Sequence, residues 1–425
     1  MSSSVLQLGL TALLAFYVAW NLGANDVANS MGTSVGSKAL TLRRAIIIAG
    51  VLEFSGAVIF GQNVAATLAT EIVEPELFAD TPKLLLLGMV AVLLAAGLWL
   101  QIATSLGLPV ASSHAVVGAI AGFSWIAAGF NSVDWSNIGS ITSAWLITPF
   151  ISGAIAALFY SQIQRWILNQ PDPLAQLQEW IPWLSVILLS VFGIIVLPTI
   201  FDTPFFNSLP LPNHDFSLAV GAIAAITLTI TSWRGLEALK TRVNDSEAKK
   251  EQLQAVEKQL GRFQILSACF VAFAHGSNDV GNAIAPLAAI AYILRTGTVP
   301  IVNFVIPLWI LILGGIGIVA GLAVLGKNVI TTVGEEIITL QPSSGFCAEI
   351  ATATTVLVAS RLGLPVSTSQ ALVGGVVGIG LFQQSQKIKF QTVKSVVLAW
   401  VITLPATAIL SGIGFFVLRS LFLPN

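Results

Sequence analysis

Apolar residues run along the chain in blocks about as long as a membrane-spanning helix, and short polar segments separate the blocks. Within a block, apolar residues are nearly continuous, whereas an exposed strand would alternate them with polar ones. A helix needs about 20 apolar residues to cross a bilayer. The pattern therefore predicts an all-α chain with about twelve transmembrane segments, near residues 5–28, 42–61, 84–104, 108–128, 139–161, 180–200, 217–234, 263–290, 301–325, 345–360, 364–382 and 395–418.

Several blocks contain Gly, Pro, Ser or Asn near their middle, which predicts broken helices or re-entrant hairpins. The composition agrees with a polytopic membrane protein, because the 425 residues are 55% hydrophobic and 9% charged, whereas soluble domains carry roughly 25% charged residues. The expected surroundings are therefore a lipid bilayer, taken as the plasma (inner) membrane. The net charge of −1 gives no reason to expect a nucleic acid as partner.

The distribution of Lys and Arg predicts the orientation in the membrane. If the N-terminus lies outside, the inner loops hold fifteen of the nineteen basic residues and the outer side holds four. Basic residues concentrate in cytoplasmic loops, so both termini are expected outside. The one strongly polar block, residues 235–262, is then expected to be a solvated cytoplasmic connector.

Four short motifs occur twice in the same order. Residues 23–29 (Gly-Ala-Asn-Asp-Val-Ala-Asn) return as 276–282 (Gly-Ser-Asn-Asp-Val-Gly-Asn), at an offset of 253. Gly-Leu-Pro-Val, Gly-x-Asn-Val and Trp-x-Ile-Thr motifs return at offsets of 256, 265 and 255. Seven predicted spans, an odd number, separate the starts of the two copies. The repeats are therefore expected to face opposite ways, as in many secondary transporters.

The predicted organisation has four parts. Residues 1–165 form a first transmembrane repeat, and residues 166–234 form two linking transmembrane helices. The charged connector at 235–262 follows, and residues 263–425 form the second, inverted repeat.

An Asp lies inside an apolar block in each copy of the first motif. Asp26 and Asn29 are three residues apart, and Asp279 and Asn282 repeat that spacing, so each pair shares a helix face. An ionised carboxylate is costly in hydrocarbon and is expected to meet a partner. Na⁺ prefers oxygen ligands, which carboxylates, amides and carbonyls freed by unwinding at the flanking glycines would supply. The motifs predict sodium sites, with polar packing between helices as the alternative.

Small hydroxyl residues follow both Gly-Leu-Pro-Val motifs. Because Pro favours the first turn of a helix, Ser112, Ser113, Ser367, Thr368 and Ser369 are expected at or near two helix N-termini. Helix N-termini attract anions through free N–H groups and the helix dipole. The two copies predict an oxyanion site held from both repeats, with a capped turn as the alternative.

Five further polar residues interrupt apolar blocks: Glu53, Glu349, His275, His114 and Gln370. The two acids are candidates for cation ligands, proton carriers or gate residues, and structural pairing is the alternative. His275 precedes the second Asn-Asp motif, while His114 and Gln370 end the two hydroxyl motifs. All five are predicted to serve coupling or gating, and Glu53 has no evident counterpart in the second repeat.

The paired motifs resemble the signatures of the PiT inorganic phosphate transporter family. The resemblance rests on Gly-Ala-Asn-Asp-Val-Ala-Asn-Ser at 23–30, Phe-Ala-His-Gly-Ser-Asn-Asp-Val-Gly-Asn-Ala at 273–283 and Gly-Phe-Cys-Ala-Glu at 345–349. It covers nearly the whole chain. It implies an inverted-repeat fold of about twelve spans, often dimeric, and symport of phosphate with Na⁺ or, in some bacterial members, H⁺.

Positions that match the family imply residue roles. Asp26, Asn29, Asp279 and Asn282 resemble its ion-site residues, and Glu53 and Glu349 resemble its two transport-essential acids. The expected phosphate ligands are Ser112, Ser113, Ser367, Thr368, Ser369, Asn25 and Asn278. One departure is Ala111, because family members commonly carry Ser there, as the second repeat does at Ser367.

The predicted function is Na⁺-coupled symport of inorganic phosphate by a homodimer, with sodium as a co-transported substrate and no cofactor. An H⁺-coupled phosphate permease or a sulfate permease of the same fold stays open. An intramembrane enzyme is disfavoured, because the chain contains no His-Glu-x-x-His motif and an asymmetric reaction does not need duplicated acids. A passive anion channel is a remote alternative, which would conduct without coupling.

Overall fold

The computed structural model describes residues 3–106, 110–201, 213–240, 249–301, 304–333, 340–383 and 389–423, and these are almost entirely helical. The helices are α1 (Ser3–Gly36), α2 (Leu42–Phe60), α3 (Gln62–Thr70), α4 (Pro82–Ser105), α5 (Ser112–Ala128), α6 (Trp135–Ile163), α7 (Pro173–Ile195), α8 (Leu197–Phe201), α10 (Asn213–Lys240), α11 (Lys249–Thr296), α12 (Leu308–Val333), α13 (Pro342–Arg361), α14 (Thr368–Gln383) and α15 (Phe390–Phe422). Residues 107–109, the first Gly-Leu-Pro, and 241–248 of the predicted connector lie outside the described residues.

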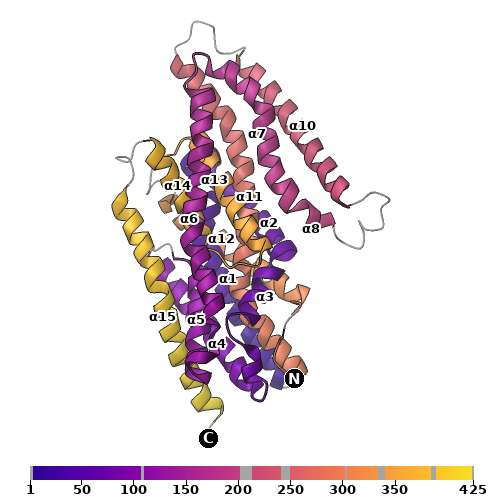
Figure 1. Cartoon of the computed structure of the whole chain (residues 1–425), viewed down its shortest axis with the longest axis vertical. Helices are drawn as coiled ribbons and strands as arrows, with labels where there is room; N and C mark the ends of the chain where they lie inside the picture. Colours follow the sequence, from indigo (N-terminus) through magenta and orange to yellow (C-terminus); the bar gives the residue numbers. More distant parts are fainter. Residues whose placement is uncertain are drawn as a thin grey trace.

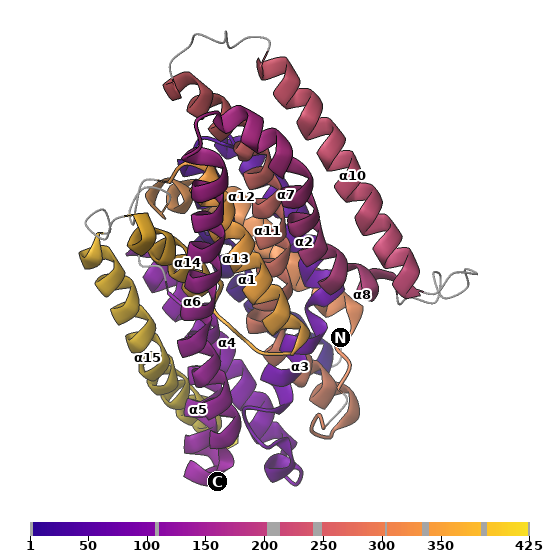
Figure 2. The same ribbon diagram turned by 45° about the horizontal axis from the view of Figure 1, so that its top comes forward.

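Most of these helices run roughly along the long axis of a bundle, and both termini lie towards one end of it (Figure 1). Helix α10 lies at the outer edge beside α7, as Figure 2 shows. The end of α10 and the start of α11 lie at the opposite end from the termini (Figure 1).

Seven of the described helices are long and apolar enough to cross a membrane, and α2 with α3 forms an eighth candidate span, bent by 59°. Helices α5 and α14 are shorter apolar helices, while α11 and α13 carry the polar residues of the predicted site. With these four additions, each of the twelve apolar blocks corresponds to a helix. The prediction of an all-α polytopic membrane protein with broken helices is confirmed.

Glycines at repeat-related positions make equivalent helix crossings. A Cβ on Gly23 would lie 1.9 Å from the carbonyl oxygen of Ile318, and one on Gly276 would lie 2.0 Å from that of Glu53. Residues 53 and 318 are themselves 265 positions apart, the offset of the Gly-x-Asn-Val motif. Helix α1 therefore packs on α12 as α11 packs on α2, and glycine permits this close approach.

The second pair of crossings follows the same rule. A Cβ on Gly122 would lie 2.1 Å from the carbonyl oxygen of Ala408, and one on Gly378 would lie 2.2 Å from that of Gly153. Helix α5 packs on α15, and α14 packs on α6. Each of these helices thus packs on a helix of the other repeat. This interlocking is consistent with two related repeats, and it means that segments separate in sequence are mixed in space.

The predicted connector is not a separate solvated helix. Residues 235–240 end α10, and residues 249–262 begin α11, which continues unbroken to Thr296. Within the charged sequence, Val256, Gln259 and Leu260 are buried. Their spacing places them on one helix face, and the high charge of the segment concealed this face in the sequence.

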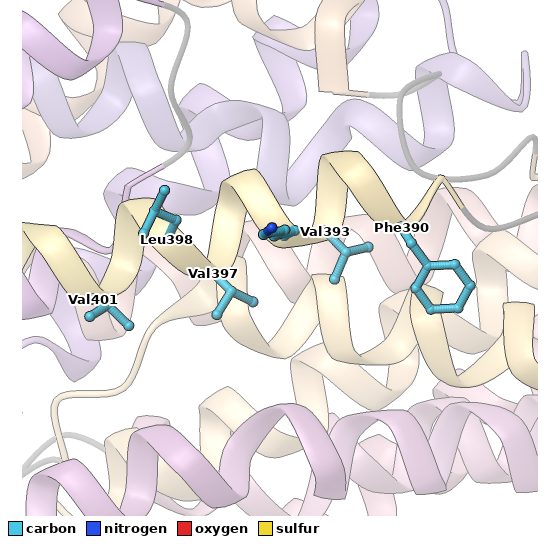
Figure 3. Close-up of a pocket in the computed structure, with 6 residues that line it drawn as sticks. Phe390, Val393, Val397, Leu398 and Val401 are labelled. Carbon is cyan, nitrogen blue, oxygen red and sulfur yellow. The ribbon is translucent and has the colours of Figure 1, made fainter.

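The outward face of α15 is apolar. A surface pocket of about 390 Å³ lies on this face, lined by Lys394 and five apolar residues. Figure 3 labels these five, Phe390, Val393, Val397, Leu398 and Val401. Most of these side chains are exposed, which would be unfavourable in water and is the expected surface towards lipid.

Candidate functional site

Two helices from different repeats bring the two predicted Asp residues together. Helix α1 carries Asp26, and α11 carries both Asp279 and His275, one turn apart. His275 Nε2 lies 3.0 Å from Asp279 Oδ2 and 4.0 Å from Asp26 Oδ2. A ligand atom from each of the three buried side chains lies within 4.8 Å of the others. Asp26, His275 and Asp279 are called the central Asp cluster below.

Glu53 joins this cluster through His275. His275 Nδ1 lies 3.1 Å from Glu53 Oε2, and Ser30 donates to Glu53 Oε1 at 2.9 Å. The positions related by the repeat offsets hold Leu22 for His275 and Ile318 for Glu53. The polar bridge therefore occurs in one half only, as the missing counterpart of Glu53 in the sequence predicted.

Each Asp accepts a side-chain hydrogen bond on one of its two carboxylate oxygens. Asn29 donates to Asp26 Oδ1 at 3.1 Å, and Thr368 donates to Asp279 Oδ2 at 3.1 Å. Asp26 Oδ2, Asp279 Oδ1 and the Asn282 side-chain oxygen accept no hydrogen bond from the residues that the structure describes. Buried acceptors without donors are costly. Carboxylate and amide oxygens of this kind are what a hard cation requires.

Helices α1 and α11 run unbroken through both Asn-Asp motifs. The unwinding expected at the flanking glycines is therefore not observed, and the backbone carbonyls there stay within the helices. Gly23 and Gly276 serve the close helix crossings instead. The backbone carbonyls of α1 and α11 at these motifs are therefore not freed to serve as cation ligands.

Two short helices begin beside the cluster. Ser112 starts α5, and its hydroxyl accepts from Asn282 Nδ2 at 3.4 Å. Thr368 starts α14 and donates to Asp279. The structure therefore brings the predicted hydroxyl motifs of both repeats to the Asn-Asp motif of α11, with helix N-termini adjacent to the acids.

The other hydroxyls divide between capping and free groups. Ser367 Oγ accepts from the Gln370 N–H at 3.3 Å and bonds to Ser369 Oγ at 2.8 Å, so Ser367 caps α14. Ala111, at the equivalent position before α5, offers no side-chain cap, which forgoes about 1 kcal/mol of helix stabilisation. Ser113 Oγ is buried and has no hydrogen-bond partner among the described residues.

Asn278 braces the chain before α14. Its amide donates to the Leu364 carbonyl and to Ser360, both at 3.1 Å, and its oxygen accepts from the Val366 N–H at 3.2 Å. These bonds use the donors and the acceptor of the side chain, so its contacts differ from the expected phosphate contact. Asn25 donates to a hydroxyl of α4 at 3.0 Å.

Glu349 is the centre of a second buried polar group, called the Glu349 pocket. It accepts four hydrogen bonds from α1 and α11, donated by Thr33 (2.6 Å), Ser34 (2.7 Å), Gln264 (3.2 Å) and Ser267 (2.6 Å). None of these four described donors is basic. These hydrogen bonds tie α13 to two other helices.

The sequence interpretation missed these donors, although their spacing carries a signal. Thr33 and Ser34 continue the polar face of α1 beyond Asn29, and Gln264 and Ser267 are three residues apart on α11. Residues 32–36 also read Gly-Thr-Ser-Val-Gly, the Gly-x-Ser-x-Gly pattern of hydrolases. The pattern lies inside α1 rather than at a strand-to-helix turn, so it forms no nucleophile elbow.

His114 and Gln370 occupy equivalent positions in the two repeats and contact each other. His114 Nε2 lies 3.2 Å from Gln370 Nε2, and His114 Nδ1 lies 3.1 Å from the Trp400 carbonyl. The His114 ring stacks on Trp145, with ring centroids 3.8 Å apart. Equivalent positions of two symmetry-related repeats can touch only near the axis that relates them. The pair therefore links the first turns of α5 and α14.

This arrangement has a clear chemical consequence. Two acids, amide oxygens and hydroxyls converge with two helix N-termini, and the basic side chain in contact with the acids is His275. An oxyanion at the helix starts would lie near the negative charge of Asp26 and Asp279. Cations between the anion and the carboxylates would stabilise both.

Known proteins resemble this chain along nearly its whole length. The model of the phosphate transporter family matches residues 22–411. A Haemophilus influenzae protein named as a candidate phosphate permease is 41% identical over 413 residues, which cover 97% of each chain. Inorganic phosphate transporter 2-1 of Arabidopsis thaliana, a chloroplast protein, is 38% identical over 95% of this chain and 70% of its own. The solved structure of a sodium-dependent phosphate transporter is 37% identical, with a TM-score of 0.86 over 98% of this chain and 99% of that chain.

Proposed function

The chain belongs to the phosphate transporter family, and on that premise we propose that it carries inorganic phosphate across the membrane by symport with Na⁺. Family membership makes it a multi-pass membrane transporter rather than an enzyme. The finer statements, which concern the coupling ion and the residues that bind each substrate, are argued from the site.

The observation that carries the proposal is the set of free buried oxygens at the central Asp cluster. Asp26, Asp279 and Asn282 each present an acceptor without a donor among the described residues. We assign these three, with Asn29 as the partner of Asp26, to Na⁺. The cations would neutralise the acids and attract phosphate to the adjacent helix starts.

Phosphate is assigned to the first turns of α5 and α14. Ser112, Ser113, Thr368 and Ser369 supply hydroxyls there, and free N–H groups at a helix N-terminus favour an anion. Ser367 supports the site by capping α14. Two helix starts from opposite repeats would then hold one tetrahedral anion.

The choice of Na⁺ over H⁺ follows from the types of ligand. A proton binds at a single basic atom, and an amide oxygen such as that of Asn282 is a poor base. A sodium ion instead takes several neutral and anionic oxygens together. The similarity to a sodium-dependent phosphate transporter supports the same choice.

Uptake of labelled phosphate into proteoliposomes tests the proposal, with Na⁺ and pH gradients imposed separately. We expect an inward Na⁺ gradient to drive saturable uptake at equal pH on both sides. Uptake that follows the pH gradient and ignores Na⁺ would establish the H⁺-coupled alternative. Labelled sulfate under the same gradients tests the sulfate alternative, and protein-free liposomes provide the control.

Glu53 and Glu349 belong to the same proposal as coupling or gating residues. Glu53 contacts the cluster through His275, and Glu349 ties α13 to the helix that carries Asp26. We also propose a homodimer in the plasma (inner) membrane, with both termini outside and the α10–α11 junction inside. Single cysteines near the start of α1 and the start of α11 should then react with an impermeant thiol reagent from opposite sides.

A further inference from the structure

We propose that Gln370 makes the transporter selective for phosphate over fully ionised oxyanions, by accepting a hydrogen bond from the P–OH group of the substrate. The inference rests on the proposed function, because it assigns the specificity of the same anion site. Gln370 would accept a hydrogen bond only from an anion that carries a proton, whereas the serine and threonine hydroxyls at the helix starts can donate to any oxyanion.

The hydrogen bonds of His114 fix the orientation of the Gln370 amide. His114 Nδ1 faces the carbonyl oxygen of Trp400 at 3.1 Å, and a carbonyl only accepts, so Nδ1 carries the proton. In a neutral ring, Nε2 is then an acceptor, and the group that faces it at 3.2 Å is the Gln370 NH₂. The reversed amide would bring two acceptors together. Gln370 Oε1 therefore lies on the side of the amide away from His114.

Gln370 Oε1 is a buried acceptor without a donor. The residue is 5% exposed, and Oε1 has no hydrogen-bond partner among the described residues. A buried carbonyl of this kind loses free energy unless a donor reaches it. The substrate itself can supply that donor if it carries a proton.

The place of Gln370 makes this contact geometrically reasonable. It lies in the first turn of α14, directly after Ser369, and its amide joins that turn to the first turn of α5 through His114. An anion held by both helix starts lies beside the pair that connects them. Gln370 Oε1 is the polar atom of this pair for which the described residues supply no hydrogen bond.

The chemistry of the competing anions turns this acceptor into a filter. At neutral pH, inorganic phosphate keeps at least one P–OH group, whereas sulfate and monofluorophosphate are fully ionised and have none. A fully ionised anion would place an oxygen or a fluorine against Gln370 Oε1 and leave that acceptor unpaired. Sites built to bond a substrate hydroxyl reject analogues that lack it, by large factors.

Competition for phosphate uptake in proteoliposomes tests the inference, with unlabelled phosphate, sulfate and monofluorophosphate as competitors at neutral pH. In the unmodified transporter, monofluorophosphate and sulfate should each bind at least about tenfold more weakly than phosphate. Gln370→Met keeps the approximate volume of the side chain but removes the acceptor, so the ratio of affinities should fall by about tenfold. Gln370→Glu keeps an acceptor and should retain the ratio, whatever happens to the overall rate.

The outcomes separate the inference from the proposed function. Phosphate uptake that is absent in the unmodified protein would contradict the proposed function itself. Normal phosphate uptake with equal affinity for monofluorophosphate would overturn the filter without any variant. If Gln370→Met weakens the binding of all three anions alike and so keeps the ratio of affinities, Gln370 is only a brace between helices. If Gln370→Met changes the Na⁺ requirement while the ratio stays constant, Oε1 is a cation ligand. Either of these last results also overturns the inference.

Discussion

The central Asp cluster and the Glu349 pocket are two buried acidic groups that differ in how many hydrogen bonds their carboxylate oxygens accept. Both oxygens of Glu349 accept hydrogen bonds, four in all, from hydroxyl and amide groups. The cluster instead leaves one oxygen of Asp26 and one of Asp279 without a donor among the described residues. A carboxylate satisfied by the protein stabilises a particular packing of helices, whereas an unsatisfied one needs a ligand from outside the chain. The difference is why we assign the cation to the central Asp cluster, whereas Glu349 ties three helices together at the site that we propose for coupling or gating.

The two groups also differ in their relation to the duplication. Asp26 and Asp279 are mates at an offset of 253, but the position equivalent to Glu349 at the offset of 256 is Leu93. Two of its donors, Thr33 and Ser34, likewise correspond to Pro286 and Leu287 in the second repeat. The acids that we assign to the cation thus occur in both halves, while the hydrogen-bonded group around Glu349 occurs in one. The two repeats therefore differ in the buried hydrogen bonds that join their helices.

The largest expected effect comes from removing the unsatisfied charges. Asp26→Asn and Asp279→Asn keep the side-chain volume but remove a cation ligand, so phosphate uptake should fall by at least about 100-fold at limiting Na⁺, equivalent to ~2.7 kcal/mol. Uptake at increasing Na⁺ concentrations measures the change in apparent Na⁺ affinity. Unchanged Na⁺ dependence in both variants would remove these residues from the coupling site.

The next prediction concerns stability, for which Glu349 should matter more than the Asp residues. Glu349→Leu gives the second repeat the residue of the first, yet it takes the carboxylate acceptor away from four buried donors, so we expect the free energy of unfolding to fall by about 2 kcal/mol. Thermal unfolding of the purified protein in detergent measures this loss. Asp26→Asn is the matched control and should change stability little, because it removes a buried carboxylate of which one oxygen accepts no hydrogen bond from the described residues. Equal losses of stability in the two variants would show that Glu349 and Asp26 do not differ in their contribution to folding.

A third prediction tests whether the helix crossings at Gly23 and Gly276 are equivalent, although Glu53 and Glu349 have no acidic counterparts in the other repeat. Gly23→Ala and Gly276→Ala would each press a methyl group against a carbonyl of the crossing helix, and each should cost about 1–3 kcal/mol of stability. Gly9→Ala is the control, because nothing lies within 4 Å of its added Cβ. Thermal unfolding should rank the two crossing variants together and well below the control. A tolerated Gly276→Ala beside a damaging Gly23→Ala would show that the crossings are not equivalent.

The smallest expected effect is a coupling between Glu53 and His275. Glu53→Ile and His275→Leu copy Ile318 and Leu22, the residues of the other half. Each single change leaves the remaining partner without its contact at 3.1 Å, so the double variant should be about 1–2 kcal/mol more stable than the sum of the single changes predicts. A double-mutant cycle by thermal unfolding gives this energy. Strict additivity would show that the bridge contributes no pairwise stabilisation.

Much of the architecture could be predicted from the chain because its signals are local. Nearly continuous apolar blocks specify helices in lipid, and repeated motifs indicate a duplication before any contact is known. The prediction for the charged segment was wrong in one respect, because its C-terminal part forms the start of α11. A few apolar residues at helical spacing bury one face of that part, although most of its residues are polar. The expected unwinding at the Asn-Asp motifs also failed, because glycine is compatible both with a break and with a close crossing of intact helices. Sequence does not distinguish these uses without the neighbouring helix.

The sequence by itself determined that Asp26 and Asp279 are related, buried in apolar surroundings and in need of a partner. Only the tertiary structure shows which buried acids receive hydrogen bonds from other parts of the protein. Glu349 accepts hydrogen bonds from residues of α1, 315 and 316 positions away in sequence, and of α11, 82 and 85 positions away. One oxygen of Asp26 and one of Asp279 meet no donor among the described residues. Hydrogen-bond satisfaction depends on distances of a few tenths of an ångström between segments remote in sequence. The spacing of residues along a chain cannot specify such distances until the helices are packed.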